Sequence, residues 1–292
     1  MHKKQIAVLV VVFAIMGGLF LMPVKGLIKA KDDPGHSRAT VNQSKPVSKV
    51  VDVSVVSGAA KILIGASLSA QINDLEGQLK SATSDSDKLN LQRKLAKLWD
   101  DVNQPAPAAF YYQDIAQKEN KFENWLNAGN RFNEAYRTSQ DTAAQPTFVV
   151  NAIANYKNAV KLKPADLDAK TGLGIAYVNQ TSSGITDPDG GSPMQGIMLL
   201  LDVVKQDPKN RNANLNLGLF AMKSGQFDKA IARFKTVIEQ QPEAGPYFYM
   251  AESYKELGQK KEAIAAYQKC KELVTDPTFD QKIDDYIKEL KN

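Results

Sequence analysis

Apolar residues along this chain recur at the spacing of amphipathic helices. Between residues 60 and 80, apolar side chains follow one another at steps of four, four, three and four, at Ile64, Leu68, Ile72, Leu75 and Leu79. These steps place all of them on one face of a helix. The stripe predicts a helix that either packs on the domain after it or pairs with a second copy as a short coiled coil.

A unit of about 34 residues recurs from residue 89 to residue 277. Its clearest copy has Leu217 and Gly218, then Ala230 four positions before Phe234, then Pro242. The first small residues of five such copies lie 33, 45, 44 and 33 positions apart, at Ala96, Gly129, Gly174, Gly218 and Ala251. The two long spacings place an insertion of about ten residues inside the second and third copies, near residues 139–146 and 181–196.

Each copy predicts two packed helices. A Gly or Ala at the contact lets two helix backbones approach closely, bulky residues such as Phe234 and Tyr267 fill the space between successive pairs, and a proline ends the second helix. This pattern resembles the tetratricopeptide repeat family, whose unit is a helix-turn-helix of about 34 residues.

The resemblance implies an all-α fold, a right-handed superhelical solenoid of about five helix-turn-helix units. The expected units are residues 89–121, 122–166, 167–210, 211–243 and 244–277. A last helix within 278–292 has Ile283, Tyr286, Ile287 and Leu290 on one face. We expect it to cap the final apolar surface. Residues 60–88 form the amphipathic helix and a linker.

The resemblance also implies a protein-binding groove, because four positions in the first helix of each unit face the concave side. The groove residues expected on this basis are Arg93, Lys97, Leu126, Asn130, Asn133, Thr171, Ile175, Val178, Asn212, Leu215, Leu219, Met222 and Phe248. The groove changes from polar to apolar along its length. Exposing an apolar strip to water costs about 25 cal/mol per Å² of apolar surface, so we expect something to cover it. The occupant could be a bound partner segment or, equally, the protein's own loops or its 60–80 helix.

Two features refine the expected ligand. Some family members clamp a peptide's C-terminal carboxylate with cations, but Asp168 and Gly172 stand at positions where that clamp needs them. The resemblance therefore disfavours a carboxylate ligand. The groove asparagines, together with Asn216, could instead hydrogen-bond an extended peptide backbone.

The N-terminus predicts a membrane segment. From Ile6 to Met22 there are seventeen consecutive uncharged residues, which as a helix would span about 26 Å. We expect residues 1–24 to be a retained single-pass signal anchor, with a cleaved secretory signal as the alternative. Residues 25–59 read as a flexible basic tether. The soluble domain is expected on the periplasmic or extracytoplasmic side of the inner membrane, with secretion after cleavage or a cytoplasmic orientation as alternatives.

The net positive charge of the chain is concentrated near the N-terminus. The chain has 292 residues, 43% hydrophobic and 24% charged, with a net charge of +5. All of the excess lies in residues 1–60, whereas residues 61–292 hold 29 basic and 29 acidic residues. The basic character therefore points to the flanks of a membrane segment, and no nucleic-acid partner is expected.

The side-chain inventory disfavours catalysis. The only histidines are His2 and His36, and the only cysteine is Cys270, expected at a buried helix contact. A catalytic triad, a Cys-His pair or a His-rich zinc site has no histidine available in the repeats. The pair Asp187 and Asp189 lacks the further ligands of a calcium loop. We expect no cofactor and no metal.

These observations predict a non-enzymatic, membrane-tethered scaffold that binds a protein or peptide partner through its groove and inserted loops. The alternative is a self-assembling structural protein, a homo-oligomer in which the 60–80 helix or the tether fills the groove of its own or a neighbouring chain.

Overall fold

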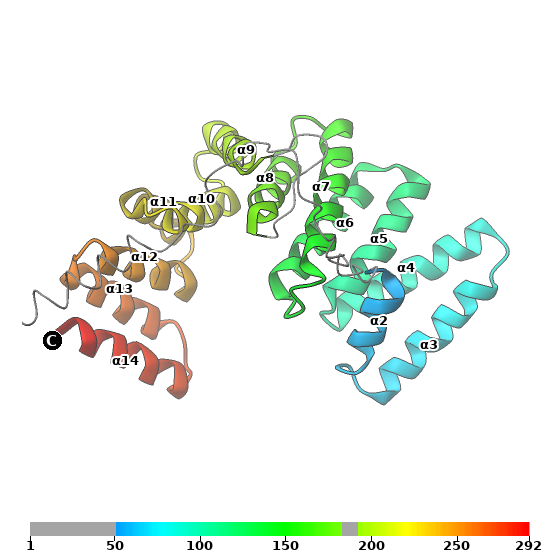
Figure 1. Cartoon of the computed structure of the whole chain (residues 1–292), viewed down its shortest axis with the longest axis horizontal. Helices are drawn as coiled ribbons and strands as arrows, with labels where there is room; N and C mark the ends of the chain where they lie inside the picture. Colours follow the sequence, from blue (N-terminus) through cyan, green and yellow to red (C-terminus); the bar gives the residue numbers. More distant parts are fainter. Residues whose placement is uncertain (1–50, 183–191, 292) are drawn as a thin grey trace, which may run out of the picture. The chain divides into compact units, whose positions relative to one another are not determined.

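The computed structural model describes residues 51–182 and 192–291, which form thirteen helices and no strand (Figure 1). Their bounds are α2 Val53–Lys61, α3 Ala66–Ser81, α4 Asp85–Asp101, α5 Pro105–Glu119, α6 Phe122–Thr138, α7 Gln145–Leu162, α8 Leu167–Ser182, α9 Pro193–Gln206, α10 Arg211–Lys223, α11 Phe227–Gln240, α12 Ala244–Glu256, α13 Lys260–Glu272 and α14 Pro277–Lys291. The expected membrane anchor and most of its tether lie outside the described residues. So does most of the insertion at 181–196. Within the described ranges, no helix has the length and apolarity needed to cross a bilayer.

From α4 onward the chain is an all-helical solenoid, in which each helix packs against the next one along the chain (Figure 1). Contacts also join α6 to α8, α8 to α10 and α10 to α12, so the first helices of successive pairs line up. Local sequence marks the helix ends. Prolines occupy the first turn of α5, α7 and α9, where a missing N–H costs nothing. Pro164, Pro208 and Pro242 each follow the last helical residue by two positions.

Small residues permit the close helix crossings. A Cβ added to Gly218 would lie 2.6 Å from the ring of Phe234, and one added to Gly174 would lie 2.9 Å from the carbonyl oxygen of Gly196. Glycine is required at both positions because neighbouring atoms fill the space. Large rings fill the interior between these contacts. Trp99, Phe132, Phe148, Tyr156, Phe234 and Tyr267 are all fully buried.

Cys270 is fully buried in α13, and its thiol donates a hydrogen bond to the carbonyl oxygen of Ala244 at 3.2 Å. Burial raises the pKa of this thiol. A thiol held protonated in this way is a poor nucleophile. Its surroundings fit a packing role.

The N-terminal part differs from the expectation of a tether reaching to residue 59. Residues 53–59 belong to helix α2, although three of its first four residues are valines. Asp52 caps the helix, accepting hydrogen bonds from the backbone N–H groups of Ser54 and Val55 at 2.9 and 3.0 Å. Val56 and Ala60 are buried, and α2 packs on α5. Capping and tertiary packing therefore outweigh the low helix propensity of valine.

The apolar stripe expected over residues 60–80 packs within the chain. Its helix, α3, begins only at Ala66, because Gly65 has a φ of +82° and interrupts the helical path. Ile72 is fully buried, and Leu75 and Leu79 pack with it against a cluster that contains Trp99 of α4. The apolar stripe of α3 thus packs against α4. A coiled coil with a second copy would need the same side chains, which already pack within this chain.

The polar side of α3 is also fixed to its neighbours. The carboxylate of Glu76 accepts hydrogen bonds from Ser57 Oγ at 2.6 Å and from the hydroxyl of Tyr111 at 3.2 Å, and it pairs with Lys61. These contacts join α3 to both α2 and α5. Burial first, and the nearby Glu76 carboxylate second, raise the pKa of Tyr111.

We expect Glu119 to make the stability of the chain pH-dependent. Its carboxylate is 16% exposed, accepts hydrogen bonds from Lys121 at 2.7 Å and Asn124 at 3.0 Å, and pairs with Arg93 at 2.9 Å. These partners, Lys121 first, lower the pKa of Glu119 to about 2. An unfolded glutamate titrates near about 4.3, so the stabilisation is complete above that pH and is lost as the pH falls towards 2.

In urea titrations, Glu119→Gln should therefore be less stable than the wild type at pH 7, and the difference should shrink as the pH is lowered to about 2.5. The control is Glu239→Gln, on the exposed side of α11. A gap for Glu119→Gln that stays constant between pH 7 and about 2.5 would contradict the assignment.

Candidate protein-binding groove

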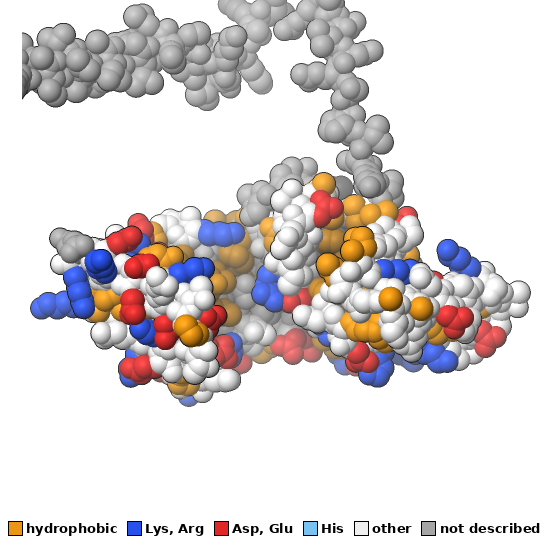
Figure 2. Space-filling view, turned by 90° about the horizontal axis from the view of Figure 1, so that it is seen from below, with side chains coloured by type: hydrophobic (Ala, Val, Ile, Leu, Met, Phe, Trp, Pro, Cys, Tyr) orange, Lys and Arg blue, Asp and Glu red, His pale blue; other side chains and the backbone are white. Residues whose placement is uncertain are grey.

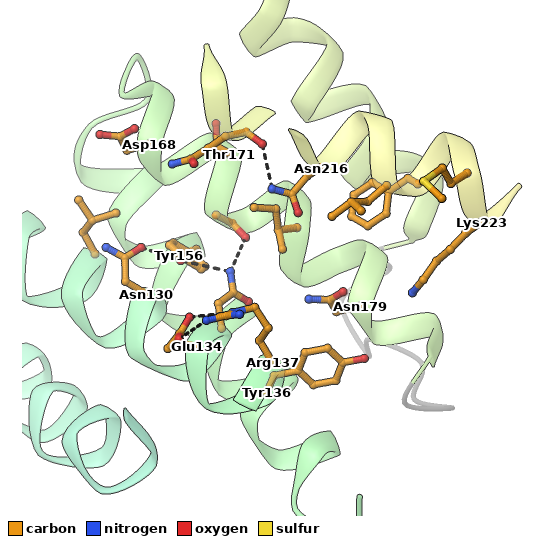
Figure 3. A pocket seen from close by; sticks show the side chains of 18 of the residues that line it. Asn130, Glu134, Tyr136, Arg137, Tyr156, Asp168, Thr171, Asn179, Asn216 and Lys223 are labelled. Carbon is orange, nitrogen blue, oxygen red and sulfur yellow. Dashed lines mark hydrogen bonds and ion pairs between the residues drawn. The ribbon is translucent and has the colours of Figure 1, made fainter. Parts of the chain in front are cut away.

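A hollow of about 730 Å³ opens between α6, α8 and α10, and Tyr156 of α7 and Tyr249 of α12 also contribute to its lining (Figure 3). First helices of successive pairs supply most of its walls. The lining residues are Leu126, Asn130, Asn133, Glu134, Tyr136, Arg137, Tyr156, Asp168, Thr171, Gly172, Ile175, Asn179, Asn212, Asn216, Leu219, Phe220, Met222, Lys223 and Tyr249.

A hydrogen-bonded network forms the base of the hollow. The hydroxyl of Tyr156 donates to Asn130 Oδ1 at 2.7 Å (Figure 3). The amide nitrogen of Asn133 donates to the same hydroxyl and to the carbonyl oxygen of Gly172, each at 3.2 Å. Tyr156 is buried, and this burial raises the pKa of its hydroxyl. The network joins α6, α7 and α8, and it fixes two asparagines at the surface of the hollow.

Two polar oxygens of the hollow have no hydrogen-bond partner within the described part of the chain. They are Asn133 Oδ1 and the hydroxyl of Thr171, and both atoms are shielded from solvent. Buried polar atoms are nearly always paired in folded proteins, because an unpaired one costs about 1–3 kcal/mol. A bound molecule could donate to these two atoms only after neighbouring side chains moved aside.

Apolar side chains lie among these polar groups. Leu126, Ile175, Leu219 and Met222 are only half-buried. They come from three first helices, α6, α8 and α10. An occupant could thus place apolar side chains and backbone amides against the same surface.

Charges at the hollow are mixed in sign. Arg137 pairs with Glu134 in the preceding turn, which raises the pKa of the guanidinium, and Lys223 forms no ion pair with any carboxylate of the described residues. Figure 2 likewise shows Lys or Arg interspersed with Asp or Glu over the face it draws. The hollow carries no concentrated charge for a polyanion.

Eight residues expected to face the groove are brought together at the hollow: Leu126, Asn130, Asn133, Thr171, Ile175, Asn212, Leu219 and Met222. Five are not. Arg93 pairs with Glu119 at 2.9 Å, and Lys97 pairs with Asp101 at 3.0 Å on its own helix. These two are placed away from the hollow because its walls begin at α6.

The other three are half-buried and do not line the hollow. A Cβ added to Gly196 of α9 would lie 3.0 Å from Val178, so Val178 faces the α8–α9 contact. Leu215 packs on the C-terminal hydrophobic cluster. Phe248 lies against Tyr267 and Tyr286, with ring centroids 5.9 and 6.2 Å apart. Helix α14 follows the last pair, and its Tyr286 packs against the half-buried Phe248, which does not line the hollow.

Several lining residues were missed by the sequence-based stripe. Glu134, Tyr136, Arg137 and Lys223 lie within the last turns of α6 and α10, just beyond the four positions considered. Extending the groove-facing stripe by one helical turn would have identified two of them. Arg137 follows Asn133 by four residues, and Lys223 follows Leu219 by four. Tyr156 and Tyr249 come from other faces of the units, and only the packing reveals them.

Comparison with known protein families finds tetratricopeptide repeats in part of the chain. Two tetratricopeptide repeat profiles match the chain. They cover residues 193–253 and 247–274, so the C-terminal units carry tetratricopeptide repeats by sequence as well as by fold. A search of curated proteins gives no significant match.

Several solved structures also align with the chain. A thermophilic protein from Thermus thermophilus, TTC0263, matches with a TM-score of 0.50 and 20% identity over 69% of this chain and 98% of that one. MamA matches with a TM-score of 0.45 and 18% identity, over 69% of this chain and 96% of MamA. YrrB, described as a tetratricopeptide repeat protein with an unusual peptide-binding site, gives 0.44 and 16% over 72% and 96%. The likeness to TTC0263 supports a tetratricopeptide-like solenoid.

Proposed function

We propose that this chain is a non-enzymatic scaffold that binds an extended segment of a partner protein in the hollow between α6, α8 and α10. The observation that carries the proposal is the lining of that hollow, where amide side chains and half-buried apolar side chains from three first helices lie side by side. Scaffolding of protein contacts is the coarse role that the repeat pattern supports.

The chemistry of the lining matches a peptide. An asparagine side chain carries one acceptor and one donor group, the same pair that each peptide unit presents. Asn130, Asn133, Asn212 and Asn216 come from two helices on opposite sides of the hollow, so they could pair with successive peptide units of an extended segment. Its apolar side chains would cover Leu126, Ile175 and Leu219.

We also propose that the chain is anchored in a membrane and that its repeats form a right-handed superhelix of about five units. The apolar run from Ile6 to Met22, with Lys3 and Lys4 before it and Lys25 after it, supports a retained anchor. We propose that the repeats lie on the extracytoplasmic side. Protease added to intact spheroplasts should then digest the repeats. Complete protection of the repeats would contradict this orientation, and a mature N-terminus at or beyond residue 24 would contradict a retained anchor.

Site-specific photocrosslinking tests the binding site. A photoreactive phenylalanine analogue at Asn216 or Lys223 of the full chain, in its native host, should crosslink to one recurring segment of a partner protein. The matched control places the same analogue at Lys261, an exposed residue of α13 away from the hollow. We expect at least ten times less of that product from the control. Equal products from all three positions would contradict the proposal.

The same experiment separates the self-assembling alternative. Helix α3 packs on α4, which argues against its insertion into the hollow of its own chain. A neighbour's tether remains an alternative occupant. Crosslinks from Asn216 or Lys223 to residues 25–50 of another copy would favour self-assembly over a separate partner.

A further inference from the structure

A second groove lies between α9 and α11, on the second helices of their pairs. Its volume is about 370 Å³. Ile197 and Leu201 of α9 line one side, Lys229 and Arg233 of α11 line the other, and Phe220 of α10 lies among the residues between them. Phe220 is also the only residue it shares with the hollow described above.

The α9 side of this groove continues into an exposed apolar stripe. Met194, Ile197, Met198 and Leu201 follow at positions i, i+3, i+4 and i+7, which is one face of a helix. Met194 and Met198 are each 63% exposed, and Leu201 is 43% exposed. Surface helices normally turn such a face towards the core. Here Leu200, Val203 and Val204 occupy the core side of α9, so the helix has a second apolar face turned outwards.

The composition of this stripe suits a protein ligand. Methionine is unbranched and polarisable, so it adapts to different apolar partners and is common on surfaces that bind helices. A bound helix presents its own apolar residues at the same i, i+3, i+4 and i+7 spacing. The two stripes are therefore complementary in length and period.

The α11 side supplies positive charge. Lys229 Nζ donates to Gln226 Oε1 at 2.7 Å, and the Arg233 guanidinium donates to Asn214 Oδ1 at 3.0 Å. Neither cation forms an ion pair within the described residues, and no carboxylate lines the groove. Asp202 of α9 is already paired with Lys170 at 3.0 Å. The groove thus combines an apolar wall with a basic wall that has no acidic partner of its own.

We propose that this α9–α11 groove binds an acidic amphipathic helix of a partner protein. The apolar face of that helix covers Met194, Met198 and Leu201, and its carboxylates pair with Lys229 and Arg233. This second interaction surface is separate from the hollow, so the protein can hold two partner segments at once, one on each side of the helix pairs.

Two synthetic helical peptides serve as probes. Both carry leucines at i, i+3, i+4 and i+7, and one has glutamates and the other lysines beside that stripe. Fluorescence anisotropy with the full chain should show the glutamate peptide binding at least tenfold more tightly than the lysine peptide. Met198→Asp and Lys229→Glu should each weaken the glutamate peptide tenfold or more, and Lys229→Glu should strengthen the lysine peptide.

Val150→Asp is the matched control, because Val150 is an exposed apolar residue of α7, 45% exposed, outside the groove. It should leave both affinities unchanged. All three substituted residues are exposed, and unchanged thermal unfolding would exclude misfolding as a cause. The proposal is overturned if neither peptide binds, if Met198→Asp has no effect, or if sedimentation shows a dimer that Met198→Asp dissociates. A dimer of that kind would mean that the apolar stripe of α9 binds a second copy of this chain and not a partner protein.

Discussion

Tyr267→Ala should lower the free energy of unfolding by about 3–5 kcal/mol, the cost typical of truncating a buried aromatic ring. The ring of Tyr267 is fully buried in α13. It stacks on Tyr286 of α14 at a centroid distance of 5.7 Å and packs edge-on against Phe248 of α12 at 5.9 Å. One ring therefore joins three helices, and its loss leaves a cavity that the surrounding helices can fill only partly.

The effect should be concentrated at the C-terminal end. In a repeat array each unit contacts only its neighbours, so a local loss lowers the stability of the end before that of the whole. Hydrogen exchange in residues 277–291 should accelerate most, and urea unfolding followed by circular dichroism should become broader. Tyr267→Phe is the control. It keeps the ring and removes only the hydrogen bond from the tyrosine hydroxyl to the Glu252 carboxylate, which should cost about 1.5–3 kcal/mol because the acceptor is charged. Equal losses for both variants would refute a packing role for the ring.

Periodicity predicted this solenoid well because the same physical demand recurs in each unit. A small residue must stand where two helices cross, and a large ring must fill the next space, as at Gly218 and Phe234. The residues facing the hollow obey a helical spacing too, which is why Asn130, Thr171 and Leu219 could be placed on one side of the array.

The repeat spacing does not predict a residue's surroundings where the array ends or where a helix outside the repeats packs against it. Phe248 has the spacing of a groove residue, but its ring packs against Tyr286 of α14, a contact that the repeat spacing does not reveal. The valines of α2 favour an extended chain locally, yet the Asp52 cap, the burial of Val56 and the packing of α2 on α5 stabilise a helix there. Likewise, the apolar face of α9 that carries Met194 and Met198 looks like core in the sequence. Its exposure is a property of the packed structure, in which Leu200 and Val203 already fill the core side of α9.

Gly172→Ala should destabilise the protein by about 1–3 kcal/mol, as expected for overpacking in a close-packed interior. A Cβ at this position would lie 2.2 Å from two ring carbons of Tyr156 and 2.6 Å from its hydroxyl oxygen. Tyr156 is buried and cannot move away without disturbing its neighbours. Alanine has an intrinsic advantage over glycine of about 1 kcal/mol in a helix, but a contact this short exceeds that gain.

Gly77→Ala supplies the matched control for this substitution. Gly77 lies inside α3, and no heavy atom beyond its own helix backbone and chain neighbours lies within 4 Å of its added Cβ. There the change should raise stability by about 0.5–1 kcal/mol through helix propensity alone. Thermal and urea unfolding should thus shift in opposite directions for the two variants.

The same substitution also tests how the hollow is built. Displacing the Tyr156 ring would break its hydroxyl contacts with Asn130 and Asn133, which are the links that hold the asparagines in place. Combining Gly172→Ala with Tyr156→Leu should recover part of the lost stability, because the shorter side chain leaves room for the methyl group, but it should not restore the asparagine positions. Photocrosslinking from Asn216 should therefore be weaker in the double variant than in the wild type, even though the double variant has regained stability. A double variant that regains full crosslinking would show that the hollow does not depend on the tyrosine network.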